Sequence, residues 1–158
     1  MHYRILLLSI TLVACSPRER SEQAELTPVT VSLPEFQQLD WIAGTWRGSG
    51  GEYPAFFEEY RVLDDSTIQM RSFSDSTLNV MSDSSWIQWR NGTIRSQGGE
   101  PAYVAVDFTP TSIRFARPGV ALGGHTFASK SADEWTATLH PSRPDGQATV
   151  YTMRRLPR

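Results

Sequence analysis

The chain has 158 residues, of which 39% are hydrophobic and 11% aromatic, and 15 basic against 17 acidic side chains give a net charge of −2. A charge this close to zero provides no electrostatic attraction to nucleic acid or to anionic lipid, so the composition disfavours both as partners. The length favours one folded domain, large enough to bury a core without disulfides or a structural metal.

The first fifteen residues predict export. His2 and Arg4 precede an apolar run from Ile5 to Ala14, which ends at the single cysteine, Cys15. This layout is typical of a signal peptide, and about ten residues of helix span only half of a ~30 Å hydrocarbon core. Leu12-Val13-Ala14-Cys15 resembles the lipobox of bacterial lipoproteins. The resemblance implies cleavage before Cys15 and lipidation of its thiol and its new amino group; the alternative is an ordinary signal peptide with a chance cysteine.

The residues after Cys15 predict a tether on a membrane surface. Ser16 stands where an aspartate would resemble an inner-membrane retention signal. The lipoprotein resemblance therefore implies an outer-membrane anchor in a Gram-negative cell, facing the periplasm. The stretch up to Leu33 has too little apolar content to offset the entropy of ordering it. We therefore predict a signal peptide at 1–14, a lipid-anchored tether at 15–33 and a monomeric folded domain at 34–158.

The folded part is predicted to be all-β with one short helix. Pro34 suits a first helical turn and Gly44 a helix end, which indicates a helix over Pro34–Ala43. Beyond Gly44, short segments rich in β-branched and aromatic residues alternate with turn clusters about every ten residues, which is typical of a β-sandwich or β-barrel. About ten strands are expected, one of the short candidates being no strand. The candidates are Thr45–Ser49, Ala55–Leu63, Ser66–Ser74, Leu78–Met81, Ser84–Arg90, Thr93–Gln97, Ala102–Thr109, Ser112–Arg117, His125–Ser129, Glu134–His140 and Ala148–Leu156.

The links between these segments favour a barrel. Asn91-Gly92 predicts a two-residue hairpin, because both residues tolerate positive φ. Asp64-Asp65, Thr109–Thr111, Ala132-Asp133 and Pro144–Gly146 are further sharp links. Short links make neighbouring strands antiparallel, so we predict an up-and-down antiparallel β-barrel; the alternative is an open β-sandwich.

A short motif resembles a known group of barrels. Gly44-Thr45-Trp46-Arg47-Gly48 resembles the Gly-x-Trp signature of the calycins, the lipocalin and fatty-acid-binding-protein group. The resemblance implies that Trp46 closes one end of the barrel and that an arginine of the last strand, Arg154 or Arg155, packs over its indole. Such a cation–π contact contributes about 0.5–2 kcal/mol.

Two longer resemblances add less. The residues from Gly44 to Pro54 are similar to the opening of the nitrobindins, ten-stranded haem barrels, but the glycine stretch is one residue shorter. The iron-ligating histidine of the last strand is also missing, since no histidine follows His140. Leu39 to Trp46, with Glu58-Glu59-Tyr60, resembles an uncharacterised bacterial family of short calycin-like domains, which implies a fold and no function.

The polar residues predict neither catalysis nor a metal or cofactor site. Glu58 and Glu59 are adjacent, so a strand places them on opposite faces, and we expect one to be solvated and the other to pair with an interior arginine. His125 and His140 have no carboxylate at ligand spacing. No nucleophile elbow, phosphate loop or cysteine cluster is present in the sequence.

Strand alternation suggests which residues line the interior. If Phe56, Glu58 and Tyr60 point inward, the next strand offers either Ile68, Met70 and Ser72 or Gln69, Arg71 and Phe73. An inward arginine would need an anionic ligand group or a pairing with Glu58 or Glu59. The candidate lining residues are Phe56, Glu58, Tyr60, Arg71, Trp89, Arg114 and Tyr151.

One loop is a candidate portal. Arg117–Gly124 contains three glycines and no strand periodicity, whereas Val120 and Leu122 are too apolar for a purely solvated loop. This favours a mobile flap at the barrel mouth, completed by His125; the alternative is that Val120 and Leu122 cover the outside of the barrel.

Two kinds of function fit these patterns. The first is a non-catalytic binder of a small apolar or amphipathic molecule, because a barrel of about ten strands is wider than side chains alone readily fill. The second is a structural or interaction module of the cell envelope with a filled barrel. A third, weaker hypothesis is a porphyrin bound without the usual histidine.

Overall fold

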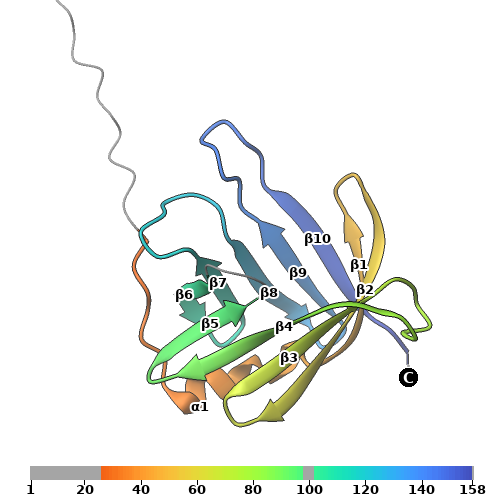
Figure 1. Cartoon of the computed structure of the whole chain (residues 1–158), viewed down its shortest axis with the longest axis horizontal. Coiled ribbons are helices and arrows are strands. Elements are labelled where there is room, and N and C mark those ends of the chain that lie inside the picture. The colour runs from red at the N-terminus through yellow and green to blue at the C-terminus, as the bar shows by residue number, and fades with distance from the viewer. Residues whose placement is uncertain (1–25, 98–101, 158) are drawn as a thin grey trace, which may run out of the picture.

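The computed structural model describes residues 26–97 and 102–157 and shows a closed, antiparallel ten-stranded barrel (Figure 1). Each strand pairs with the next along the chain, and β10 closes the barrel against β1. The predicted up-and-down barrel is therefore confirmed, and the open sandwich is excluded. The strands are β1 Gly44–Gly50, β2 Tyr53–Asp64, β3 Thr67–Phe73, β4 Met81–Arg90, β5 Thr93–Gln97, β6 Tyr103–Thr109, β7 Ser112–Ala116, β8 His125–Ser131, β9 Glu134–Leu139 and β10 Thr149–Arg155.

The predicted short helix is present as two short helices that follow each other directly. The α-helix α1, Leu33–Phe36, continues as the 3₁₀ helix η1, Gln37–Ile42. Ser32 caps α1: its hydroxyl accepts a hydrogen bond from the Glu35 N–H, and its own N–H donates to the Glu35 carboxylate at 2.7 Å. This capping box begins the helix one residue before Pro34.

One candidate strand is absent, as expected. Leu78–Met81 forms no strand of its own, because Leu78 has a φ of 58°, which extended backbone does not allow. Met81 instead begins the ten-residue strand β4, whose ladder to β3 runs from Met81 to Gln88. The Asn91-Gly92 hairpin is confirmed: both residues have positive φ, 49° and 83°, and Arg90 pairs with Thr93.

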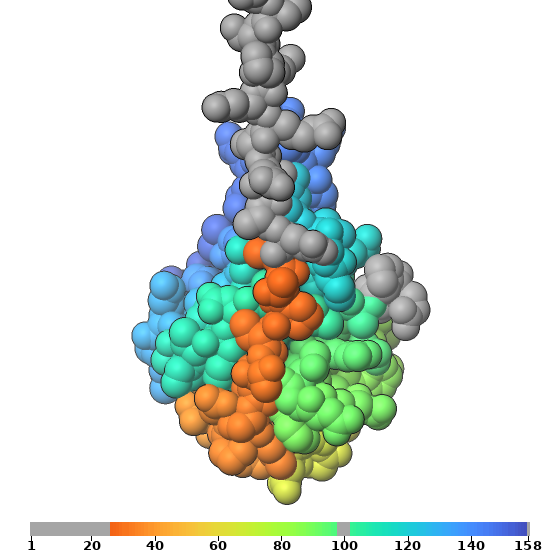
Figure 2. Space-filling model, turned by 90° about the vertical axis from the view of Figure 1, so that its left-hand side faces the viewer, coloured from red at the N-terminus to blue at the C-terminus, as the bar shows by residue number. Residues whose placement is uncertain are grey.

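The chain joins the barrel before the predicted start at Pro34. The Val29 N–H donates to the Ala105 carbonyl at 3.0 Å and the Val31 N–H donates to the Gly92 carbonyl at 2.9 Å. Val31 is only 2% exposed. Figure 2 shows this segment lying along the flank of the barrel. The predicted signal peptide, Cys15 and the part of the predicted tether up to residue 25 lie outside the described residues. In the part of the chain that is described, no helix is long and apolar enough to cross a bilayer.

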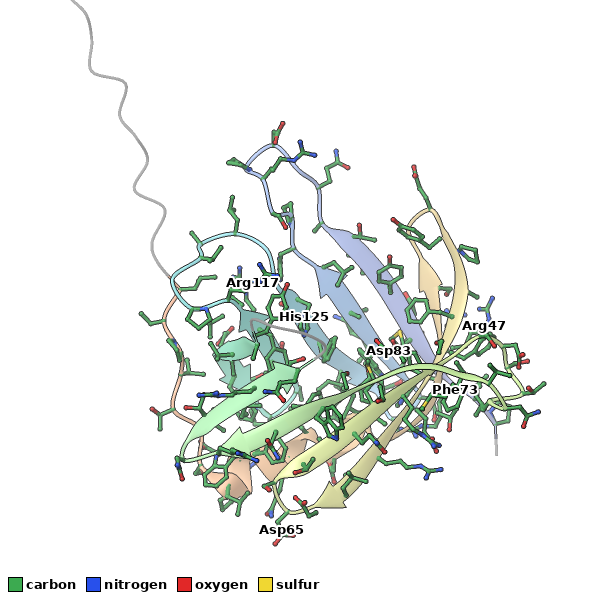
Figure 3. All side chains as sticks on the ribbon, viewed as in Figure 1. Arg47, Asp65, Phe73, Asp83, Arg117 and His125 are labelled. Carbon is green, nitrogen blue, oxygen red and sulfur yellow. The ribbon has the colours of Figure 1, made fainter. Side chains whose placement is uncertain are left out.

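The half of the barrel next to the helix is filled. Trp46, Trp135, Phe115, Leu39, Ile42, Ile94, Ile113 and Met153 are the largest side chains there, each at most 1% exposed. The indole N–H of Trp41 on η1 donates to the Pro110 carbonyl in the β6–β7 turn at 3.1 Å, which fastens η1 to this end. Asp65, in the β2–β3 turn, also lies at the helix end (Figure 3). The β1–β2, β7–β8 and β9–β10 connections lie at the opposite, open end.

Candidate functional site

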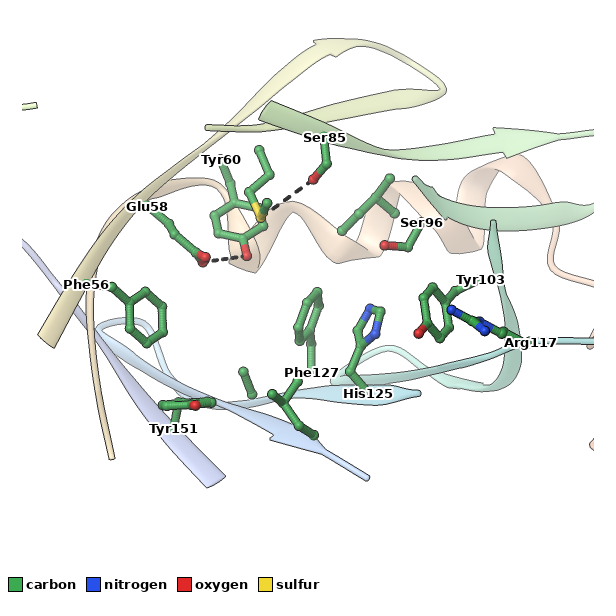
Figure 4. Close-up of a pocket in the computed structure, with 14 residues that line it drawn as sticks. Phe56, Glu58, Tyr60, Ser85, Ser96, Tyr103, Arg117, His125, Phe127 and Tyr151 are labelled. Atoms are coloured by element: carbon green, nitrogen blue, oxygen red, sulfur yellow. Dashed lines mark hydrogen bonds between the residues drawn. The ribbon is translucent and has the colours of Figure 1, made fainter. Parts of the chain in front are cut away.

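The open half of the barrel contains a cavity of about 520 Å³ (Figure 4). Its volume lies within the ~300–1,000 Å³ typical of small-molecule sites. The walls are mostly apolar and aromatic, with a few polar groups. The lining residues are Phe56, Glu58, Tyr60, Met70, Ser85, Ile87, Ser96, Tyr103, Arg117, His125, Phe127, Ala137, Leu139 and Tyr151.

The strand register determines which side chains point inward. On β2, Phe56, Glu58 and Tyr60 line the cavity, and Tyr60 lies opposite Met70 on β3. Met70 is therefore inward and its neighbour Arg71 outward. Of the two alternatives left open by the sequence, the set that contains Met70 is the one that faces the interior.

Three of the seven candidate lining residues are not in the cavity wall. Arg71 lies on the outer face, where its Nε donates to Glu59 Oε2 at 3.0 Å. Arg114 alternates with the buried Ile113 and Phe115, so it points away from the interior. Trp89 belongs to the closed half, where its indole N–H donates to the Val31 carbonyl at 2.7 Å.

Glu58 is the acidic residue of the cavity wall. The Tyr60 hydroxyl donates to Glu58 Oε2 at 2.9 Å. Burial raises the pKa of Glu58, partly offset by this hydrogen bond, and burial together with the Glu58 charge raises the pKa of Tyr60 well above its usual value. None of the ion pairs among the described residues includes Glu58.

The expectation of one solvated glutamate and one paired with an interior arginine was wrong in both parts, since Glu58 lines the cavity and the arginine partners of Glu59 are not in the interior. Glu59 is the paired carboxylate, and its partners Arg61 and Arg71 are on the outer face of the sheet. These charge-assisted hydrogen bonds outweigh its partial burial and lower the pKa of Glu59. The interior carboxylate, Glu58, therefore has no arginine partner among the described residues.

Aromatic rings stand beside Glu58. Phe56 and Tyr151 meet edge to face, with ring centroids 5.2 Å apart. The Phe56 ring lies so close to β1 that a Cβ added at Gly48 would overlap it. The absence of a side chain at Gly48 therefore lets the Phe56 ring pack against β1. Phe56, Tyr60 and Tyr151 all lie at the Glu58 end of the cavity (Figure 4).

The other end of the cavity carries the positive charge. The Arg117 guanidinium lies 5.4 Å from the centroid of the Tyr103 ring. His125 packs between Phe115 and Phe127, each with its ring centroid 5.0 Å away. Burial, and to a smaller extent the charge of His140, lowers the pKa of His125 to about 4, so this imidazole is neutral at pH 7. Glu58 and Arg117 lie at opposite ends in Figure 4.

The sequence named Met70 as a lining residue in only one of its two alternatives, and it did not identify Arg117, Ser85 or Phe127. Arg117 was detectable, because it continues the inward alternation Ile113, Phe115, Arg117 beyond the end of β7. Of the three predicted portal residues, His125 lines the cavity, whereas Val120 and Leu122 do not. Val120 is 42% exposed. The loop is fastened to the β9–β10 connection, since the Gly123 N–H donates to the Pro141 carbonyl at 2.8 Å.

At the closed end, Trp46 occupies the place that the calycin resemblance implies. Its side chain is fully buried, and its indole N–H donates to the Ile42 carbonyl at 2.8 Å. The Arg155 guanidinium lies 4.1 Å from the ring centroid. Arg154 points outward instead and pairs with Glu134 on the surface, because neighbouring residues of β10 face opposite sides of the barrel wall.

Comparison with known proteins assigns the chain to no family. No family model and no curated protein matches the sequence. A redesigned beta barrel is similar in structure, with a TM-score of 0.39 and 10% identity over 77% of this chain and 96% of that chain. EF1p2_mFAP2b bound to DFHBI has a TM-score of 0.35 and 11% identity over 76% and 98%. At these values the likeness says nothing about what this chain binds.

The described residues contain no cluster of three or more metal-ligating side chains.

Proposed function

We propose that the protein is a non-catalytic binder of a small apolar or amphipathic molecule, which it holds in the open half of the barrel. The observation that carries this proposal is the cavity of about 520 Å³ above a filled closed half. A purely structural module would have no need for this space, because leaving a large apolar void unfilled costs stability. The aromatic walls and the few polar groups at its two ends are what an amphipathic ligand requires.

We further propose that a lipid on Cys15 holds the protein at the outer membrane, facing the periplasm. The lipobox-like residues support this, as does the place where the described chain begins, beside the β7–β8 connection at the open end (Figure 1). Ten residues lie between Cys15 and Leu26, so the two are eleven residue steps apart. As a flexible chain this segment would span roughly 17–20 Å, which keeps the cavity mouth near the lipid. Mass spectrometry of the mature protein tests this: an unmodified Cys15 contradicts the proposal.

The binding proposal is tested by titration with N-phenyl-1-naphthylamine, a neutral dye that fluoresces in apolar surroundings. Ser85 lines the cavity and Ser84 faces outward opposite Arg71, so Ser85→Phe fills the site and Ser84→Phe is its matched control. We expect the wild type and Ser84→Phe to bind the dye equally and Ser85→Phe to bind it at least about tenfold more weakly.

A second variant that fills the cavity keeps the test valid if Ser85→Phe does not fold. Ala137→Leu enlarges a side chain on β9, which contributes to another part of the cavity wall. It should also weaken dye binding, while near-ultraviolet circular dichroism shows whether each variant keeps its tertiary packing. A wild type that does not bind the dye, or filling variants that bind it unchanged, would contradict the proposal.

A further inference from the structure

We propose that the cavity selects amphipathic molecules with a single ammonium group, and that Glu58 binds this group. The inference rests on the proposed function and names its ligand class. Three features of the described residues carry it: an interior carboxylate without a counter-ion, aromatic rings around that carboxylate, and a positive charge at the far end of the cavity.

The first feature is the uncompensated carboxylate. Glu58 lines the cavity, and none of the ion pairs among the described residues includes it. Arg61 and Arg71, the arginines of the neighbouring ladder, both bind Glu59 on the other face. A carboxylate removed from water without a cation is costly, and a ligand ammonium would supply the missing charge.

The second feature is the set of rings beside this carboxylate. Phe56, Tyr60 and Tyr151 line the same end of the cavity, and the faces of aromatic rings attract cations. Aromatic rings combined with a carboxylate form the arrangement by which proteins recognise quaternary and methylated ammonium groups. Tyr60 also orients Glu58, because its hydroxyl donates to Oε2. The described residues give Oε1 no hydrogen bond, so this oxygen is available to a ligand.

The third feature limits the ligand to one positive end. Arg117 lies at the far end of the cavity and would repel a second ammonium, so a diamine is disfavoured. Between the two ends the walls are apolar, formed by Met70, Ile87 and Phe127 among others. A molecule with one ammonium head and an apolar body would place its head at Glu58 and its body against the apolar walls.

The test compares three probes with the same twelve-carbon chain: dodecyltrimethylammonium, dodecan-1-ol and dodecanoate. The two ionic probes are used below their micelle concentrations and the alcohol below its solubility limit, to displace N-phenyl-1-naphthylamine from the full chain at pH 8. For the wild type we expect the cation to bind at least about tenfold more tightly than the alcohol, and more tightly than dodecanoate, whose carboxylate only Arg117 at the far end could bind.

Two neighbouring glutamates provide the variant and its control. Glu58→Gln keeps the size of the side chain and removes its charge, so the preference for the cation over the alcohol should fall to less than about threefold. Glu59→Gln makes the same change on the outer face and should leave the preference intact. The affinity for dodecan-1-ol shows whether the cavity of each variant is intact.

A second variant keeps the inference testable if Glu58→Gln does not fold. Phe56→Leu retains an apolar side chain but removes an aromatic face, so it should weaken binding of the cation more than binding of the alcohol. Equal affinities for cation and alcohol in the wild type, or an undiminished preference in Glu58→Gln, overturn the inference and leave the proposed function standing. If the dye binds and none of the probes displaces it, only the inference is overturned; if the dye itself does not bind, both are overturned.

Discussion

Trp46 provides the sharpest test of how the barrel is closed. Trp46→Ala removes a fully buried indole. Its ring centroid lies 5.9 Å from the centroid of the Trp135 ring and 4.1 Å from the Cζ atom of Arg155. Replacing a buried tryptophan by alanine costs about 3–5 kcal/mol of unfolding free energy. The Ile42 carbonyl also loses the hydrogen bond from the indole, which places the expected loss at the upper end, about 5 kcal/mol.

Urea denaturation measures this loss. With an m-value of about 2 kcal/mol/M, the unfolding midpoint should fall by roughly 2–2.5 M relative to the wild type. Trp86→Ala is the matched control, because Trp86 is 41% exposed on the outer face of β4. Trp86→Ala should lower the unfolding free energy by less than about 1 kcal/mol. If both variants shift the midpoint by similar amounts, Trp46 does not close the barrel and the reasoning is refuted.

The remaining predictions concern the last strand, the wall beside Phe56 and the pH dependence of stability. Arg155→Met should lower the unfolding free energy by about 1–2 kcal/mol, whereas Arg154→Met should change it by less than about 0.5 kcal/mol, both by urea denaturation. Gly48→Ala should displace the Phe56 ring and weaken dye binding, since the new Cβ would overlap it. Because the pKa of His125 falls from 6.5 to about 4 on folding, its contribution to stability is lost as the pH falls through that window. The wild type should therefore lose up to about 3 kcal/mol relative to His125→Phe between pH 6.5 and pH 4 in pH-dependent denaturation, and a constant difference would contradict this.

The sequence predicted the strands well because their signals are local. Alternating side chains mark β9, and Asn91-Gly92, which tolerates positive φ at both positions, marks the β4–β5 hairpin. It failed where a tertiary contact decides the conformation. Val29 and Val31 were assigned to a tether on composition, although Val29, Val31 and Leu33 alternate as a strand does, and the barrel flank supplies their hydrogen-bond partners.

The site was harder to predict because alternation gives two faces and does not say which one is inside. Arg71 and Met70 are neighbours, and only the ladder to β2 turns Met70 inward and Arg71 toward Glu59. Depth along the barrel is also invisible in the sequence. Trp89 faces the interior and is still no lining residue, because it lies in the filled half and donates to the Val31 carbonyl.

Methyl NMR of the methionines tests most directly whether the open half of the barrel is the binding site. Of the chain's four methionines, Met70 lines the cavity, Met153 is fully buried in the closed half and Met81 is 53% exposed on the rim. Titration with N-phenyl-1-naphthylamine should shift the Met70 methyl signal in a saturable way and leave those of Met81 and Met153 in place. A shift at Met81 with none at Met70 would place the dye on the outer surface and contradict binding in the cavity.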